Sequence, residues 1–227
     1  DEDGSEFIGL RFSGRLYWDG EPILTSTTEG CFTECLSIAY LKISPERDIV
    51  WAKLVENDDF NLGNGEYIYS DGNGGIIILL SYQENLTLDG NEIIDYAYNP
   101  GHGTSHIARI GSTGNLEWHT QITGDPYLGT IQNVNVVDNI LRFRWTSDEI
   151  GNYYHIDNTS YSYNSTGVGY REVFVGIDVI SGQMLWNNLL ECESINSSDC
   201  IYGTNEGFTD EDGSEFIGLR FSGRLYW

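Results

Sequence analysis

The chain has few basic residues. Eleven Lys and Arg stand against 35 Asp and Glu in 227 residues, a formal net charge of −24 at pH 7. Phosphate backbones and anionic lipid headgroups require clustered basic side chains, so this balance excludes nucleic acid and anionic membrane surfaces as partners. The longest apolar run, Ile76 to Leu80, is far shorter than the roughly 20 residues that cross a bilayer. We therefore expect no membrane insertion.

Proline is also scarce, with 4 residues against 27 Gly, which excludes a collagen-like or proline-rich rod. Apolar residues at helical spacing are missing as well. Instead, β-branched and aromatic residues alternate with polar ones, and Gly, Asn and Asp separate the runs. The pattern predicts an all-β protein.

One segment of the sequence occurs twice. Residues 1–18, DEDGSEFIGLRFSGRLYW, recur letter for letter as residues 210–227, which gives a period of 209. Two explanations stay open: a recent duplication inside one closed domain, or a stretch of a longer tandem array. Because a closed domain has no need of a second copy of its own edge, we favour the array.

A weaker repeat lies within this period. Trp51, Trp118 and Trp186 are 67 and 68 residues apart, and each follows an alternating strand and a turn. A further strand-like run precedes each of these hairpins, after a tight turn of Asp-Gly or Asp-Asn, residues that tolerate positive φ. In the second and third units another run, 67–69 or 134–137, stands before that turn. Four strands per unit with a Trp-bearing hairpin are typical of propeller blades. The tight turns are Asp3-Gly4, Asp71-Gly72 and Asp138-Asn139.

The sequence therefore predicts about three four-stranded antiparallel, propeller-like blades per period. Because propellers close with about four to eight blades, we expect these blades to be open or completed by a neighbouring copy. The expected divisions are a first blade over 1–65, whose first strand comes from a preceding copy, a second over 66–130, a third over 131–200, and the first strands of the next blade over 201–227.

The run DVISGQMLW at 178–186 resembles the D-x-x-[ST]-G-x-x-x-W signature of the pyrroloquinoline-quinone-type (quinoprotein-like) β-propeller repeat. The second unit keeps Thr113, Gly114 and Trp118 of this pattern, and the first keeps only Trp51. The resemblance implies that the three repeated Trp residues pack between adjacent blades, and that the Gly allows the turn ahead of each. It implies architecture before activity, since such blades occur in enzymes, assembly scaffolds and surface proteins.

Both ends of the chain are interpreted as incomplete blades. By alignment with the other units, the N-terminal blade needs a strand before Asp1, and the C-terminal copy lacks its Trp-bearing hairpin. Incomplete sheets join chains by strand addition, and a head-to-tail contact that does not close produces a fibre. The apolar residues expected at this contact are Phe7, Leu10 and Phe12, with their repeats Phe216, Leu219 and Phe221.

The four cysteines form two local pairs, Cys31 with Cys35 and Cys192 with Cys200, out of three possible connectivities. Neither pair has the Cys-x-x-Cys spacing of zinc or thioredoxin sites. We therefore expect two loop disulfides, which place the protein outside the reducing cytosol.

Four Asn-x-Ser/Thr sequons predict covalent N-glycans. All four lie between the aligned strands, where we expect irregular structure. The longest stretches expected to be irregular are 19–35, 83–105, which contains Asn85, and 147–169, which contains Asn158 and Asn164. Together with the disulfides, the sequons predict an extracellular or cell-surface location. The four sequon residues are Asn85, Asn158, Asn164 and Asn196.

The sequence offers no catalytic or cofactor site. A quinoprotein dehydrogenase, which the resemblance allows, uses a complete propeller with Ca²⁺ at its centre and often adjacent cysteines, and this sequence has no adjacent cysteines. The histidines of GHGTSH, His102 and His106, are interpreted as exposed loop residues. Acidic clusters at 1–6, 57–64 and 210–215 offer oxygen ligands for Ca²⁺ without a complete loop signature, so no metal ligand is assigned.

We expect a structural subunit of a secreted, N-glycosylated fibre or surface array, assembled head to tail from identical units, and not an enzyme. Two alternatives stay open. One is a carbohydrate- or protein-binding adhesin, for which Tyr153, Tyr154, His155, Tyr161 and Tyr163 offer aromatic platforms. The other is a degenerate quinoprotein dehydrogenase.

Overall fold

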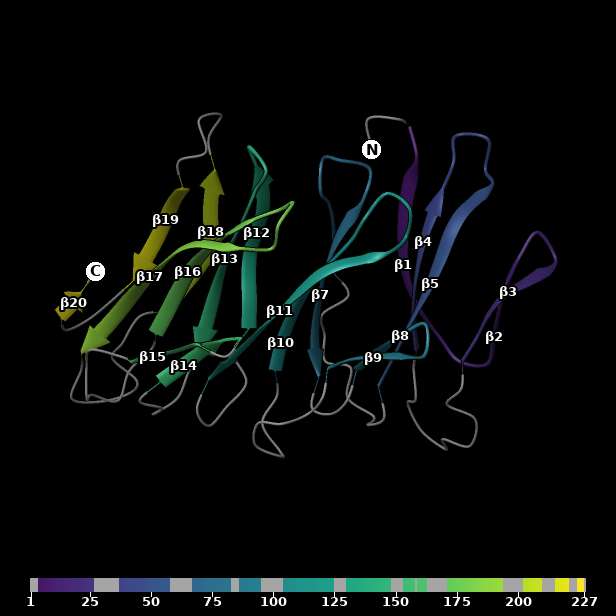
Figure 1. Ribbon diagram of the computed structural model, residues 1–227. Coiled ribbons are helices and arrows are strands. Elements are labelled where there is room, and N and C mark those ends of the chain that lie inside the picture. The colour runs from purple at the N-terminus through teal and green to yellow at the C-terminus, as the bar shows by residue number, and fades with distance from the viewer. Residues whose placement is uncertain are drawn as a thin grey trace. The chain divides into compact units, whose positions relative to one another are not determined.

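Every regular element in the described part of the chain is a β-strand (Figure 1), so the all-β prediction is confirmed. No helix in this part is long and apolar enough to cross a membrane. The chain forms two compact units, residues 1–119 and 120–227, which are described separately. The computed structural model describes residues 4–26, 37–57, 67–82, 86–94, 104–124, 130–147, 153–157, 159–162, 171–193, 202–209, 215–220 and 224–226.

Unit 1 contains an antiparallel sheet in the order β1-β4-β5-β8-β9. β1 pairs with β4 along its whole length, from Glu6 opposite Ile43 to Phe12 opposite Ser37. The hairpin of β8 and β9 follows β6 and β7 in the chain but is hydrogen-bonded to β5. The strands are β1 (Glu6–Phe12), β4 (Ser37–Ile43), β5 (Ile49–Asn57), β8 (Leu86–Leu88) and β9 (Asn91–Ile94).

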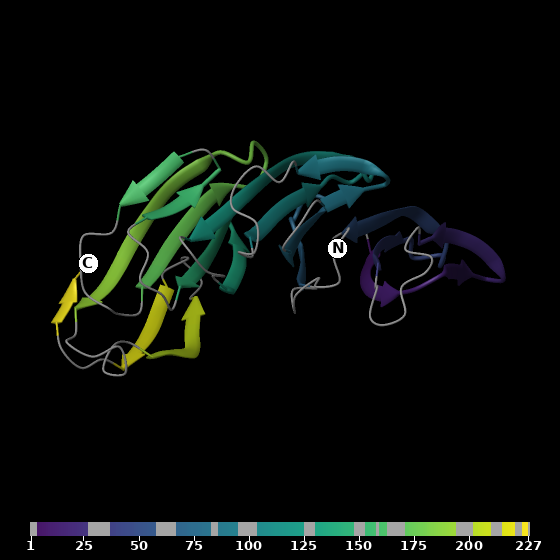
Figure 2. The ribbon, with the colours of Figure 1, turned by 90° about the horizontal axis from the view of Figure 1, so that it is seen from below.

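A second group of strands in unit 1 runs in the order β6-β7-β10-β11. The boundary between the units falls inside β11, after His119. A separate two-stranded sheet, β2 with β3, extends from the rest of unit 1 (purple in Figures 1 and 2). The strands are β2 (Arg15–Trp18), β3 (Glu21–Thr25), β6 (Tyr67–Ser70), β7 (Ile76–Tyr82), β10 (Thr104–Ile110) and β11 (Leu116–Gly124).

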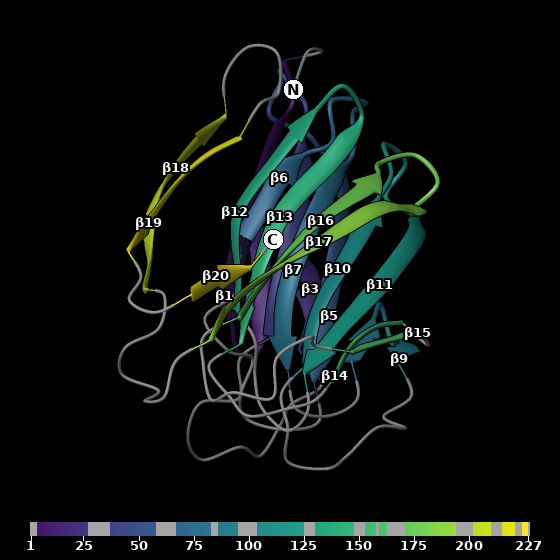
Figure 3. The same ribbon diagram turned by 90° about the vertical axis from the view of Figure 1, so that its left-hand side faces the viewer.

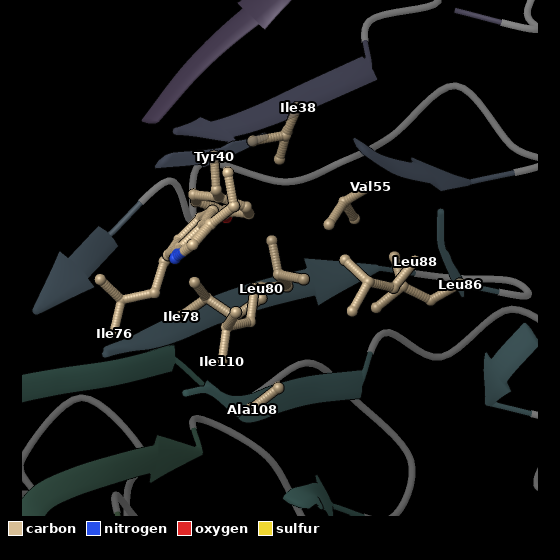
Figure 4. Packing of buried hydrophobic residues seen from close by; sticks show 11 residues of the cluster. Ile38, Tyr40, Val55, Ile76, Ile78, Leu80, Leu86, Leu88, Ala108 and Ile110 are labelled. Atoms are coloured by element: carbon tan, nitrogen blue, oxygen red, sulfur yellow. The ribbon is translucent and has the colours of Figure 1, made fainter. Parts of the chain in front are cut away.

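The core of unit 1 lies between these two groups of strands. Figure 4 shows side chains from β4 and β5 on one side and side chains from β7 and β10 on the other, with those of β8 closing the end of the cluster. Burial of apolar surface stabilises a fold by about 25 cal/mol per Å², so this cluster holds the two groups together. Its buried members are Ile38, Tyr40, Trp51, Val55, Ile76, Ile78, Leu80, Leu86, Leu88, Ala108 and Ile110.

Unit 2 contains an antiparallel sheet in the order β12-β13-β16-β17-β20. The second half of β11 carries the hairpin of β14 and β15, and β18 lies beside β19 (yellow in Figure 3). The strands are β12 (Thr130–Val137), β13 (Ile140–Ser147), β14 (Tyr153–Ile156), β15 (Thr159–Ser162), β16 (Arg171–Asp178), β17 (Met184–Glu193), β18 (Tyr202–Thr209), β19 (Glu215–Arg220) and β20 (Arg224–Tyr226).

Three stretches expected to be irregular contain strands, so that expectation was wrong for part of each. The stretch 19–35 contains β3, 83–105 contains the β8–β9 hairpin, and 147–169 contains β14 and β15. Each of the three Trp-bearing repeats therefore has an additional short hairpin, which the strand pattern of the sequence did not predict. The β8–β9 hairpin lies in the range predicted for the second blade, 66–130, yet it belongs to the sheet of the first.

One predicted tight turn is longer than expected. Val137 is opposite Ile140, so Asp138 and Asn139 form a two-residue turn, and both have positive φ, as predicted. At the equivalent turn, Ser70 is opposite Ile76, which leaves the five-residue loop 71–75. The carboxylate of Asp71 organises this loop and binds the buried Arg109, as described below.

Candidate assembly site

Each unit of the repeat carries the same short hairpin. In all three hairpins the residues that flank the turn are opposite each other, as Leu88 is to Asn91, so the turn has two residues. The first turn residue is an aspartate with positive φ, 49° at Asp19, 51° at Asp89 and 50° at Asp157. Two-residue turns with positive φ match the right-handed twist of their strands. The hairpins are therefore structural equivalents.

Two of these aspartates bind the strand next to their hairpin in the same sheet, β5 for Asp89 and β11 for Asp157, in the same way. The Asp89 amide donates to the Leu54 carbonyl oxygen (2.8 Å), and Asp89 Oδ1 accepts from the Leu54 amide (3.0 Å). The Asp157 amide donates to the Gln121 carbonyl oxygen (2.9 Å), and Asp157 Oδ1 accepts from the Gln121 amide (2.9 Å). We call this pair of hydrogen bonds the aspartate clamp. It satisfies both backbone groups of one residue at a strand edge that otherwise faces solvent.

The hairpin strands also bury apolar side chains when they lie on an outer strand. Leu86 and Leu88 of β8 are 0% and 6% exposed, and Tyr154 and Ile156 of β14 are 2% and 3% exposed. The equivalent residues of β2 are Leu16 and Trp18, and both are only half-buried. Tyr17 between them is 54% exposed. In the described part of the chain, β2 pairs with β3 alone. Its apolar face is therefore less covered than those of the other two hairpins.

Two strands of the duplicated segment, β19 and β20, pair with strands of unit 2. β19 repeats the sequence of β1, and it pairs with β18 as β7 pairs with β6 and β13 with β12. β20 repeats residues 15–17 of β2, and it pairs with the outer part of β17. β8 pairs with β5, and β14 with β11, in the register in which β20 pairs with β17. β19 and β20 therefore have the positions expected for β1 and β2 of a following 209-residue repeat.

The three repeated Trp residues differ in environment. Trp51 is buried, its indole N–H donates to the Ser112 carbonyl oxygen (3.1 Å), and a Cβ on Gly114 would lie 2.9 Å from its Cγ. Trp51 thus packs on the turn before Trp118, which belongs to the next blade in the predicted division. Trp118 and Trp186 are half-buried, and a Cβ on Gly176 would lie 2.3 Å from Cε2 of Trp186.

The turn before Trp186 is held by an aspartate side chain and contains a left-handed glycine. In the turn at 178–182, Asp178 Oδ1 accepts from the amide and the hydroxyl of Ser181, both at 2.7 Å, and Gly182 has φ of 71°. The equivalent residue four positions before Trp118 is Gly114, with φ of 82°. The equivalent residue before Trp51 is Arg47, with φ of 73°. The left-handed backbone is kept without glycine at Arg47, although such φ values are unfavourable for a residue with a Cβ.

Titratable groups buried in the described residues include His106 and the pair of Arg144 and Glu172. His106 lies inside β10, fully buried, so its interpretation as an exposed loop residue was wrong. Arg144 and Glu172 are a buried pair, with Nη1 and Oε1 3.3 Å apart, and burial raises the pKa of Glu172 although Arg144 opposes this effect. Within the described ranges, no group of His, Cys, Asp and Glu is placed to hold a metal.

Burial of His106 makes stability depend on pH. Burial, with a smaller contribution from the His119 ring stacked 5.3 Å away, lowers the pKa of His106 to about 3. In the unfolded chain a His takes up its proton near pH 6.5. Between these values the unfolded state binds more protons, so stability falls as the pH drops from about 6.5 toward 3.

Replacing His106 by Phe should remove this part of the pH dependence. Between pH 7 and pH 4 we expect the native chain to lose about 2 to 3 kcal/mol more of its free energy of unfolding than His106→Phe, since one titration contributes up to about 1.4 kcal/mol per pH unit. Urea unfolding of both proteins across this range measures the difference. Parallel stability curves would contradict the assignment.

The remaining predicted site residues are placed as follows. Phe7, Leu10 and Phe12 lie in β1, and Phe7 packs on Trp51 with ring centroids 6.0 Å apart. Glu6 of the first acidic cluster faces Arg47 at 3.7 Å. The backbones of Cys192, Phe216 and Leu219 lie in β17 and β19. Of the other two acidic clusters, Asn57 ends β5 and Glu215 begins β19. The residues 1–3, 58–64 and 210–214 of the clusters lie outside the described residues, as do the predictions for Cys31, Cys35, Cys200, Asn85, Asn158, Asn164, Asn196 and Phe221.

The aromatic platform of the adhesin alternative is partly buried. Tyr154 is 2% exposed, stacks on Tyr161 (5.1 Å) and donates its hydroxyl hydrogen to Asn187 Oδ1 (2.9 Å). His155 contacts Ser160 in the partner strand. The Tyr154 ring is therefore part of the packing between β14 and β17, and no ligand reaches its face.

No protein-family model matches the chain, and no curated protein is significantly similar to it.

Proposed function

We propose that this chain is the repeating structural unit of a secreted, N-glycosylated extracellular fibre or surface array. Identical units join head to tail, because each unit supplies the strands that complete the sheets of the unit before it. The blades are propeller-like, with four strands each and a hairpin that reaches back to the preceding blade. The unit acts mechanically and performs no catalysis.

One observation carries the proposal. Residues 215–220 and 224–226 repeat residues 6–11 and 15–17, and they pair with β18 and with the end of β17. These pairings support a joint in which the start of one unit completes the sheets of the unit before it. Edge strands that present open backbone groups take up further strands, and a contact between two different surfaces that does not close yields a filament. The half-buried apolar side chains of β2 support the same joint from the other end of the unit.

Electron microscopy and intact mass of the native material test this role. We expect filaments or regular arrays whose repeat equals one 209-residue period, and a protein mass that falls by discrete amounts on enzymatic removal of N-glycans. Solitary particles of about one period, with no array in the native preparation, would overturn the proposal. A response on glycan arrays by such solitary particles would favour the adhesin alternative instead.

A further inference from the structure

The aspartate clamp has a third potential site at the joint between copies. Its two observed acceptor strands use equivalent residues, because Leu54 and Gln121 each follow a repeated Trp by three positions. The residue three positions after Trp186 is Leu189 in β17. Leu189 is opposite Val173 in the sheet, just as Leu54 is opposite Ala39. Leu189 therefore holds the clamp position on the third blade.

The register of β20 shows which residue of a following copy would meet Leu189. Glu191 is opposite Tyr226, Cys192 is opposite Leu225, and Glu193 is opposite Arg224. Continued in the antiparallel sense, this register would bring Leu189 opposite the residue that follows Trp227 in the sequence. Since Trp227 repeats Trp18, the next residue of the period is Asp19.

Asp19 already has the conformation that the clamp requires. Its φ of 49° matches the 51° of Asp89 and the 50° of Asp157, and Gly20 completes the same two-residue turn. Its side chain is exposed. The turn is therefore preformed before any partner strand arrives, which lowers the entropy lost on binding.

We infer that Asp19 of one copy clamps Leu189 of the preceding copy. The Asp19 amide donates to the Leu189 carbonyl oxygen, and the Asp19 carboxylate accepts from the Leu189 amide. The inference rests on the proposed head-to-tail joint and specifies its partner residue. The clamp fixes the register of the joint, because a slip of one residue would turn the carboxylate away from the Leu189 amide.

A short extension of the chain tests the clamp. The period's next eight residues, those of 19–26, are added after Trp227, and hydrogen exchange of the Leu189 amide is followed by mass spectrometry or NMR. We expect exchange about tenfold slower or more than in the 227-residue chain, because a hydrogen bond to an ionised carboxylate is stronger than one between neutral groups. Asp19→Ala in the added copy should abolish the gain.

Two matched controls make the outcome specific. Asp19→Ala in the N-terminal hairpin of the same extended chain should leave Leu189 unchanged. Asp89→Ala should speed exchange of the Leu54 amide, where the clamp is observed. If Leu189 is unprotected in the extended chain while the amides of Glu191 and Glu193 stay protected, the clamp is wrong but the joint stands. If the amides of Glu191 and Glu193 exchange freely as well, the pairing of β20 and the proposed assembly fail with it.

Discussion

We expect Trp51→Ala to lower the free energy of unfolding of unit 1 by about 3 to 5 kcal/mol, the range for large aromatic side chains removed from a core. Trp51 is 7% exposed, its ring packs on Phe7 and over Gly114, and its indole N–H satisfies the Ser112 carbonyl oxygen. Alanine would leave a cavity between β5 and the turn at 112–114 and remove the donor to that carbonyl. Urea unfolding followed by amide exchange in each unit measures the loss.

Trp186→Ala is the matched control, because Trp186 holds the same place in the repeat but is half-buried. We expect it to cost less than about 2 kcal/mol, in proportion to the smaller apolar area that it buries. Gly114→Ala should reproduce part of the Trp51 effect, since its Cβ would lie 2.9 Å from the Trp51 ring and its φ is 82°. Equal losses for the two Trp variants would contradict the packing role given to Trp51.

The second large effect is expected at Asp71. Its carboxylate is 0% exposed and accepts from the amides of Asn73 (2.7 Å) and Gly75 (2.8 Å) and from Nε of the buried Arg109 (2.8 Å). The Arg109 guanidinium also pairs with Glu117. Asp71→Ala would leave the guanidinium with one carboxylate and two loop amides without their acceptor. Breaking a buried ion pair from one side costs about 3 to 5 kcal/mol.

Asp138→Ala provides the comparison for Asp71→Ala. Asp138 begins the equivalent turn in the third Trp-bearing repeat, but its side chain is exposed and its φ is 52°. We expect a loss of about 1 kcal/mol there, from placing alanine in the left-handed region. Thermal and urea unfolding of both variants give the two values. A loss at Asp71 no greater than at Asp138 would mean that the buried cluster contributes little.

The sequence contained more of the repeat than its strand pattern revealed. Asp19-Gly20, Asp89-Gly90 and Asp157-Asn158 recur at 70 and 68 residues, and Asp-Gly is a strong hairpin signal. The flanking strands have only three to five residues, too few for alternation to stand out from the surrounding polar residues. The spacing of the aspartates was the signal that predicts these hairpins.

The destination of each hairpin required the structure. Sequence order places β8 and β9 next to β7, yet they lie on β5 of the preceding sheet. The reason is physical: Leu86 and Leu88 bury their side chains in the cluster with Val55 and Ile78, and Asp89 satisfies the edge at Leu54. Such non-local contacts depend on which strand leaves its edge unpaired, and the pattern of residues in the sequence does not show which strand that is. Trp51 is buried and Trp186 is half-buried because Trp51 contacts the turn at Ser112, a non-local contact of the same kind.

The most direct test of the central claim is the assembly state of the chain without residues 210–227. In the 227-residue chain the tethered copy occupies β18 and β17 at an effective concentration of about 1 mM, so we expect a single-copy mass by light scattering at micromolar protein. The 1–209 chain should form head-to-tail multimers, because β1 and β2 of one molecule fill the vacated edges of another. A peptide of sequence 210–227 should return these multimers to a single copy, and a scrambled peptide should not. Single-copy 1–209 chains, folded and indifferent to the peptide, would contradict the account.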